Sequence, residues 1–248
     1  MAKTPISRRD VLSTTALAGS LLALRGVTSA QARSIAGDVP WAAGVAAAPD
    51  GAAPGDFQFF TENEVAFVDA AMARLIPQDE LGPGAKEVGG TIFLDRQLAG
   101  PYGAANRWYM QGPWQEGSKT QGYQTRLAPA QYYRVAIKAI DDHCRDAFQG
   151  KRFAEISADD QDRVLSGLEA GEIDLGDIKS DAFFDLLLQN TIEGFFSDPI
   201  YGGNRGMAGW TLIGFPGARY DYREFVSKHG QRFDLPPVGL KGRPGWTP

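Results

Sequence analysis

The chain has 248 residues, of which 30 are acidic and 25 are basic, so its formal net charge at pH 7 is −5. Hydrophobic residues make up 43% of it, which is typical of a folded protein with a sizeable core and excludes a wholly disordered chain. A single cysteine excludes an intramolecular disulfide, an iron–sulfur cluster, an attached c-type haem and cysteine-based zinc sites. Two histidines exclude a three-histidine metal site, and the acidic balance argues against nucleic-acid binding.

The N-terminus resembles a twin-arginine export signal. Arg8 and Arg9 precede an apolar run, and Ala30 and Ala32 stand where a signal peptidase cleaves. The run is shorter than the roughly 20 apolar residues that span a bilayer, and a retained membrane anchor is the alternative. Cleavage after Ala32 removes four basic residues and one acidic residue, which changes the net charge from −5 to −8. The resemblance implies that the twin-arginine translocon carries the chain as folded cargo.

Composition divides the chain into four predicted segments. They are the signal peptide (1–32), an arm rich in Ala, Gly and Pro (33–56), a helical domain (57–233) and an extended Pro-rich tail (234–248). No segment after the signal is long and apolar enough to cross a bilayer, so we expect no direct membrane span after cleavage.

Helical periodicity recurs along the predicted domain. A capping box formed by Thr61 and Glu64 starts the first helix, which Pro77 stops. Further helices are expected over about 89–98, from near Pro129 to Gly150, from Ser157 to before Gly171, from Ser180 to about Phe196, and over 222–228. The fourth of these is the most apolar and is expected to be central. No long alternation with a period of two occurs, so the predicted fold is mostly α, a single irregular helical domain with long ordered loops.

The chain carries no recognisable motif for catalysis or for a cofactor. Phosphate-binding, dinucleotide-binding, zinc-protease and serine-hydrolase patterns are all missing. His143 and Cys144 are neighbours on a predicted helix and point about 100° apart, so we interpret them as a surface imidazole and a buried thiol. An acidic cluster between Glu172 and Asp181 lacks the spacing of a calcium loop. We therefore expect no catalytic, cofactor-binding or metal-binding residue in this chain.

Two segments are candidates for contact with a partner, because glycine, aromatic residues and arginine alternate in them. Aromatic residues and arginine dominate the hot spots of protein interfaces. The candidates are Tyr201, Gly202, Gly203, Asn204, Arg205 and Trp210 in the first segment, and Trp108 and Trp114 in the second. The second segment is a loop of nearly thirty residues over 99–127, and loops of that length are often functional. Packing against the Phe-rich helix is the alternative for the first segment.

Several short segments resemble the gluconate 2-dehydrogenase subunit 3 family over about residues 57–240. These segments are 74–77, 82–85, 95–103, 111–113, 121–124, 188–191, 198–204 and 214–218. The resemblance implies a complex of three chains. A large subunit binds FAD and oxidises gluconate or a related sugar, and a multihaem cytochrome c subunit passes the electrons to quinone. The small subunit carries no redox centre and aids export and maturation of the large one.

The same resemblance implies a periplasmic location, with attachment to the inner membrane through the partner subunits. Two other functions remain open from the residues alone. One is a stand-alone periplasmic enzyme that uses carboxylates. The other is a periplasmic module that binds a small ligand, with Trp108 and Trp114 as an aromatic platform.

Overall fold

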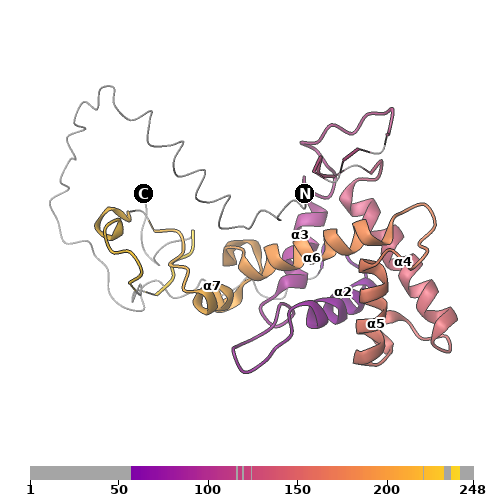
Figure 1. The fold of residues 1–248 in the computed structure, drawn as a ribbon, viewed down its shortest axis with the longest axis horizontal. Helices are drawn as coiled ribbons and strands as arrows, with labels where there is room; N and C mark the ends of the chain where they lie inside the picture. The colour runs from indigo at the N-terminus through magenta and orange to yellow at the C-terminus, as the bar shows by residue number, and fades with distance from the viewer. Residues whose placement is uncertain are drawn as a thin grey trace, which may run out of the picture. The chain divides into compact units, whose positions relative to one another are not determined.

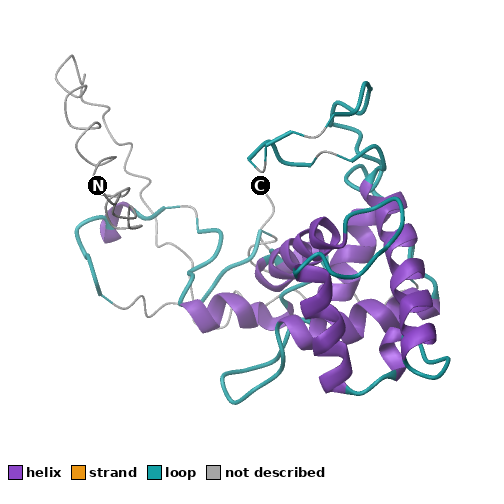
Figure 2. Ribbon diagram, turned by 45° about the vertical axis from the view of Figure 1, so that its right-hand side comes forward, coloured by secondary structure: helices purple, strands orange, loops and turns teal. Residues whose placement is uncertain are grey.

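The computed structural model describes residues 57–115, 117–118, 120–123, 125–219, 221–231 and 236–240. The predicted export signal, with Arg8, Arg9, Ala30 and Ala32, lies outside the described residues, as does the predicted arm over 33–56. In the described part, α-helices and short 3₁₀ helices make up the regular structure, and isolated bridges occur in place of strands (Figure 2). The prediction of a mostly α fold is confirmed.

The described helices follow the chain as labelled in Figure 1. The α-helices are α2 (Glu62–Leu75), α3 (Gly90–Ala99), α4 (Pro129–Ala147), α5 (Ala158–Glu169), α6 (Ser180–Phe196) and α7 (Ala208–Ile213). The 3₁₀ helices are η1 (Phe153–Glu155), η2 (Pro199–Tyr201), η3 (Arg205–Met207) and η4 (Arg223–Phe225). None of the described helices is long and apolar enough to cross a membrane.

Helix α6 is the central element, as predicted, because α2, α3, α4, α5 and α7 all pack against it. Its buried side chains include Phe183, Phe184, Leu187 and Phe195. These residues join the apolar faces of α2 to α5 in one hydrophobic core. Burial of such a face supplies most of the stability of a helix in a folded protein.

The ends of α2 follow the predicted capping pattern. The backbone N–H of Thr61 donates to Oε2 of Glu64 (2.8 Å), and the backbone N–H of Glu64 donates to Oγ1 of Thr61 (3.4 Å). The helix ends at Leu75, two residues before Pro77, which lacks the N–H that would continue it. The capping box is therefore confirmed.

Helices α3, α4 and α5 also lie close to their predicted positions. Helix α4 begins at Pro129 and α5 follows Ser157, whose Oγ accepts a hydrogen bond from the backbone N–H of Asp160 (3.2 Å). Helix α4 ends at Ala147, slightly earlier than predicted, and the backbone is left-handed at Gly150 (φ 82°).

Two short helices differ from the prediction. The predicted helix over 222–228 is wrong, because only the single 3₁₀ turn η4 forms there. That turn buries no residue, so no packing supports a longer helix. Conversely, α7 forms inside a glycine-rich segment that was expected to be a loop. Gly209 lies within this helix and Gly214 ends it, and glycine lowers helix propensity.

A buried carboxylate fixes the residues that precede α2. Asp95 of α3 is 2% exposed and accepts hydrogen bonds from the backbone N–H groups of Gln58 (2.7 Å), Phe59 (2.9 Å) and Phe60 (2.9 Å). Three such bonds satisfy a charge that would otherwise be costly to bury. Residues 58–60 are thereby attached to α3.

Candidate partner-binding surface

The segment that follows α6 is attached to the last turn of that helix through side chains. Asn204 is fully buried, its Nδ2 donates to the carbonyl oxygen of Ser197 (2.9 Å), and its Oδ1 accepts from the N–H of Gly209 (2.9 Å). Trp210 Nε1 donates to the carbonyl oxygen of Phe196 (2.8 Å). These bonds hold η3 and α7 on the C-terminal end of α6.

Two glycines allow the segment to lie directly on α6. A Cβ atom on Gly203 would lie 2.2 Å from the carbonyl oxygen of Gly194, and one on Gly209 would lie 2.4 Å from that of Phe195. Neither position has room for a side chain, so only glycine permits this approach of the two backbones. Glycine at these two positions is therefore required for the packing of α7.

The backbone of this segment is strained at non-glycine residues. Asn204 (φ 47°) and Met207 (φ 55°) both lie in the left-handed region, which costs an L-residue about 1–2 kcal/mol. Such strain persists only where the surrounding structure holds it, and it clusters at functional sites. The tight packing on α6 is what holds it here.

The consequence of this packing is an exposed apolar face on and next to α7. Leu212 is 49% exposed, Ile213 is 60% exposed and Phe215 is 44% exposed. The ring of Phe215 packs edge-on against Trp210, with 5.2 Å between the ring centroids. The segment thus buries its polar anchors and presents large apolar side chains to solvent.

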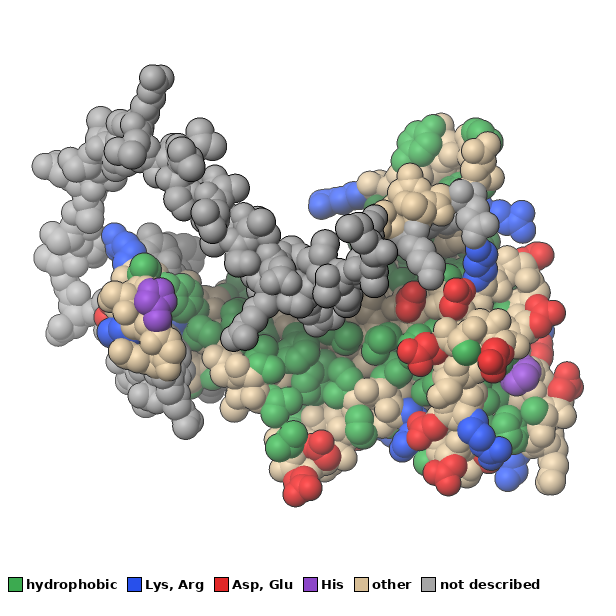
Figure 3. All heavy atoms as spheres, viewed as in Figure 1, with side chains coloured by type: hydrophobic (Ala, Val, Ile, Leu, Met, Phe, Trp, Pro, Cys, Tyr) green, Lys and Arg blue, Asp and Glu red, His purple; other side chains and the backbone are tan. Residues whose placement is uncertain are grey.

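A groove separates α7 from the turn between α2 and α3. Its volume is about 560 Å³, and its apolar lining consists of Leu75, Ile76, Pro77, Leu81, Phe195 and Leu212, among others. Leu81, at the tip of the turn, is 74% exposed. Figure 3 shows hydrophobic side chains gathered on this face, with acidic side chains at its lower edge.

The predicted residues of the first candidate segment divide into buried and exposed groups. Gly202, Gly203, Asn204 and Trp210 are buried within this chain, Arg205 is partly exposed and Tyr201 is 47% exposed. The backbone N–H of Arg205 donates to the carbonyl oxygen of Val88 (2.9 Å). The buried residues thus support the surface from within. Leu81, Leu212 and Ile213, which are among the most exposed apolar residues here, were not selected from the sequence.

The second candidate segment forms a separate aromatic cluster. The ring of Trp108 lies 5.6 Å from that of Tyr102 and 4.8 Å from that of Tyr123, and the Tyr123 ring lies 6.1 Å from that of Tyr132 on α4. Trp108 is 38% exposed and Trp114 is 43% exposed. The loop lies well away from α7 (Figure 1), so the two candidates do not form one site.

A buried amide joins this aromatic loop to the core. Asn190 of α6 is 2% exposed, and its Oδ1 accepts from the hydroxyl groups of Tyr133 (2.9 Å) and Tyr102 (3.1 Å). Its Nδ2 donates to Oε2 of Glu193 (3.0 Å). Burial raises the pKa of Tyr102, and it raises that of Tyr133 further because the latter hydroxyl has no access to solvent. Both hydroxyl groups therefore remain neutral hydrogen-bond donors.

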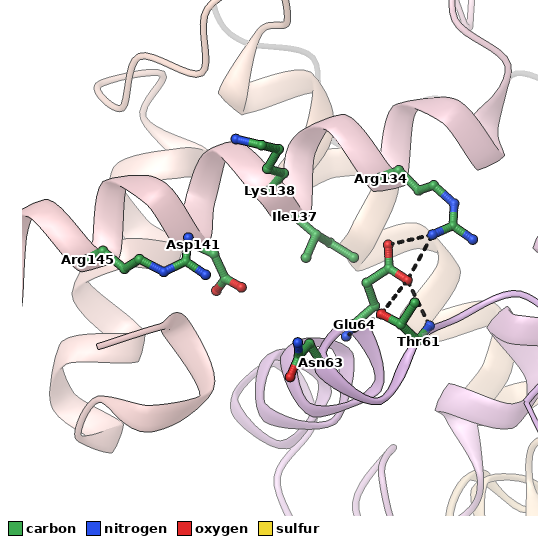
Figure 4. A pocket seen from close by; sticks show the side chains of 8 residues that line it. All are labelled: Thr61, Asn63, Glu64, Arg134, Ile137, Lys138, Asp141 and Arg145. Atoms are coloured by element: carbon green, nitrogen blue, oxygen red, sulfur yellow. Dashed lines mark hydrogen bonds and ion pairs between the residues drawn. The ribbon is translucent and has the colours of Figure 1, made fainter. Parts of the chain in front are cut away.

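A small charged pocket lies between α2 and α4. It is lined by Thr61, Asn63, Glu64, Arg134, Ile137, Lys138, Asp141 and Arg145, and its volume is about 170 Å³ (Figure 4). Arg134 pairs with Glu64 (3.0 Å), while Lys138 and Arg145 both pair with Asp142 (2.5 Å and 2.6 Å). The pair of Arg134 and Glu64 joins α4 to α2, whereas the other two pairs lie within α4.

The residues that suggested chemistry lie apart from these surfaces. Cys144 is fully buried, and burial raises the pKa of its thiol to about 12, which removes its nucleophilic form at neutral pH. His143, next to it on α4, is partly exposed. Among the residues that the structure describes, no three His, Cys, Asp or Glu side chains lie close enough to hold a metal ion.

Comparison with known families identifies the family of the chain. The family model described as gluconate 2-dehydrogenase subunit 3 matches residues 62–217, which run from the start of α2 past the end of α7. The chain belongs to this family. No curated protein and no solved structure shows significant similarity to it. As a member of a subunit 3 family, the chain is an accessory subunit of a dehydrogenase complex.

Proposed function

We propose that the chain is the non-catalytic small subunit of a periplasmic dehydrogenase complex that oxidises gluconate or a related sugar. In this proposal it binds the FAD-containing catalytic subunit, accompanies it through the twin-arginine translocon and supports its maturation. A multihaem cytochrome c subunit completes the complex and attaches it to the inner membrane.

The observation that carries the proposal is the apolar face of α7 on a chain of this family. Leu212, Ile213 and Phe215 are large and exposed, and they follow a segment that is packed tightly on α6. Exposed apolar side chains that lie together are typical of protein-binding surfaces. An accessory subunit requires such a surface. The paired arginines before an apolar run support the export part of the proposal.

Co-purification tests the assembly. The chain, tagged at its C-terminus and expressed from its native locus, is purified from the periplasm and from detergent-solubilised membranes. We expect a flavoprotein at stoichiometric yield, identified by the FAD absorbance and by mass spectrometry. Recovery of the tagged chain alone would refute the proposal.

Replacement of the paired arginines tests the escort function. We expect that Arg8→Lys with Arg9→Lys strands the catalytic subunit, and not only this chain, in the cytoplasm. Arg33→Lys is the matched control, because it makes the same chemical change beyond the predicted cleavage site. Normal export of the catalytic subunit in the double variant would contradict an escort role.

The exposed aromatic residues of the 99–127 loop favour a second candidate function, the binding of a sugar. Trp108 and Trp114 are partly exposed and Tyr109 is 81% exposed. Aromatic side chains of this kind can pack against a small ligand, and its binding would quench tryptophan fluorescence. Trp108→Phe and Trp114→Phe should then abolish a quench seen with the intact chain. Unchanged fluorescence across a panel of sugars and sugar acids would leave this function without support.

A further inference from the structure

The groove between α7 and the turn before α3 has two walls of different chemistry. One wall is the apolar face of α7, to which Leu212 contributes. The other wall is the turn over 77–83, where Asp79 and Leu81 line the groove and Glu80 is exposed beside them. The end of α6 contributes Phe195 to the lining between them.

Both walls are fixed in the free chain. The turn closes through backbone hydrogen bonds between Asp79 and Gly82 (3.1 and 3.3 Å), and the N–H of Leu81 donates to Oδ1 of Asp79 (2.8 Å). The base of the turn is closed by the N–H of Ala85, which donates to the carbonyl oxygen of Ile76 (2.9 Å). The opposite wall is held on α6 as described above. A groove that needs little ordering loses little affinity to conformational entropy when it binds.

Among the described residues, no Lys or Arg pairs with the carboxylates at the rim. Neither Asp79 nor Glu80 forms an ion pair within the described part of the chain, whereas other acidic side chains on α2 and α5 do. For example, Asp162 pairs with Arg74 at 2.6 Å. A segment that enters the groove would therefore meet an apolar lining and two unpaired negative charges at its edge. Charge complementarity requires Lys or Arg beside the apolar anchor of that segment.

We propose that this groove binds a segment of the catalytic subunit in which one or two large apolar side chains are flanked by Lys or Arg. The inference rests on the proposed function, because it takes the catalytic subunit as the partner. Ile213 and Phe215, which follow Leu212 in the chain, are also exposed and apolar, so a partner seated in the groove can contact them as well.

Two other occupants are chemically possible, and the experiment distinguishes them from the catalytic subunit. Residues 241–248 contain Lys241, Arg243 and Trp246, and they follow Leu240, whose N–H donates to Oδ2 of Asp198 (2.6 Å) after the end of α6. A single tryptophan is, however, too small to cover both the groove and the face of α7. A second copy would bring the same acidic rim and a net charge of −8 after the predicted cleavage, which opposes association.

Removal of the apolar anchors is the first arm of the experiment. Leu81→Ser with Leu212→Ser is compared with Val135→Ser, which changes a similarly exposed side chain on α4 (42% exposed). We expect the dissociation constant for the purified catalytic subunit to rise by about tenfold or more in the double variant and to be unchanged in the control. Unchanged binding in the double variant would overturn the proposal. Because both leucines are exposed, the variants should keep their far-UV circular dichroism and melting temperature.

Charge reversal at the rim is the second arm. Glu80→Lys should weaken binding by about tenfold at low salt and by less at high salt. Glu172→Lys is the matched control, because this exposed residue lies in the loop that leads into α6, whereas the groove lies at the other end of that 17-residue helix. Equal binding of Glu80→Lys and the wild type would overturn the charged part of the proposal.

Zero-length carbodiimide cross-linking of the wild-type complex identifies the occupant. A bond from Asp79 or Glu80 to a lysine of the catalytic subunit supports the proposal. A bond to Lys241 of the same chain, or to a second copy, overturns it. Failure of the wild-type chain to bind the catalytic subunit at all would instead refute the proposed function, and with it this inference. A complex that forms equally well with every variant would refute only the proposal that the groove is the binding site.

Discussion

Substitution of Asn204 separates the stabilising effect of its side-chain hydrogen bonds from the cost of its left-handed backbone. Asn204 is fully buried, and its side chain bonds both Ser197 and Gly209. Its backbone is left-handed (φ 47°). Asn204→Gly removes both hydrogen bonds but tolerates the backbone conformation. Asn204→Ala removes the same bonds and adds the strain of a left-handed alanine.

The expected losses follow from these contacts. The glycine variant leaves the N–H of Gly209 and the carbonyl oxygen of Ser197 without partners, and each unsatisfied buried group costs about 1–3 kcal/mol. We therefore expect the free energy of unfolding to fall by about 2–5 kcal/mol. The alanine variant should lose about 1 kcal/mol more than the glycine variant, because alanine is disfavoured at positive φ.

Urea unfolding, followed by far-UV circular dichroism, gives the free energy and its denaturant dependence for each variant. Asn106→Ala is the control, because Asn106 is exposed. Its free energy of unfolding should differ from that of the wild type by less than about 0.5 kcal/mol. A loss below about 0.5 kcal/mol in Asn204→Gly would refute the role of the hydrogen bonds. An alanine variant at least as stable as the glycine variant would refute the role of the left-handed backbone.

Three further predictions concern the core. Leu187→Ala and Phe184→Ala should each lower the free energy of unfolding by about 2–5 kcal/mol, since both side chains of α6 are buried. Losses below about 1 kcal/mol in both variants would contradict the central position of α6. Asp95→Ala removes the acceptor of three backbone N–H groups and should lower the free energy of unfolding by about 3–5 kcal/mol. Asp95→Asn should lower the free energy of unfolding by less, because its amide oxygen still accepts hydrogen bonds. Equal losses in the two variants would contradict the stabilising role of these hydrogen bonds. The buried thiol of Cys144, with its pKa raised from 9.0 to about 12, has about 1000-fold less thiolate at a given pH below 9. At pH 8 it should react with a thiol reagent only as fast as the chain unfolds, and rapid labelling of the native protein would refute its burial.

The long helices could be predicted because their signals are local. The pair Thr61 and Glu64 and the residue Ser157 act within four residues of their own position, and the apolar stripes of α4 and α6 repeat along one helix. Their starts therefore agree with the structure. Helix α7 could not be predicted, because its packing on α6 compensates for the low helix propensity of Gly209. A short stretch of sequence does not reveal that packing.

Which residues of the candidate segment reach solvent could not be predicted from the sequence. The glycines and aromatic residues after α6 identify a segment with unusual packing, but not which of its side chains reach solvent. Trp210 is a residue type typical of hot spots, yet its Nε1 donates to the carbonyl oxygen of Phe196 and the residue is only 5% exposed. Leu81 is far from this segment in sequence, and it lines the same groove as Leu212 only through the tertiary fold.

The attachment of α7 to the last turn of α6 makes the surface of α7 depend on the core. Gly194, Phe195, Phe196 and Ser197 supply the atoms on which the segment rests, so α7 has no support until α6 is complete. Helix α6 is in turn packed against every helix from α2 to α5. The outward-facing arrangement of Leu212, Ile213 and Phe215 therefore depends on an intact last turn of α6. A substitution that disrupts the last turn of α6 should therefore alter this surface even where Leu212, Ile213 and Phe215 themselves are unchanged.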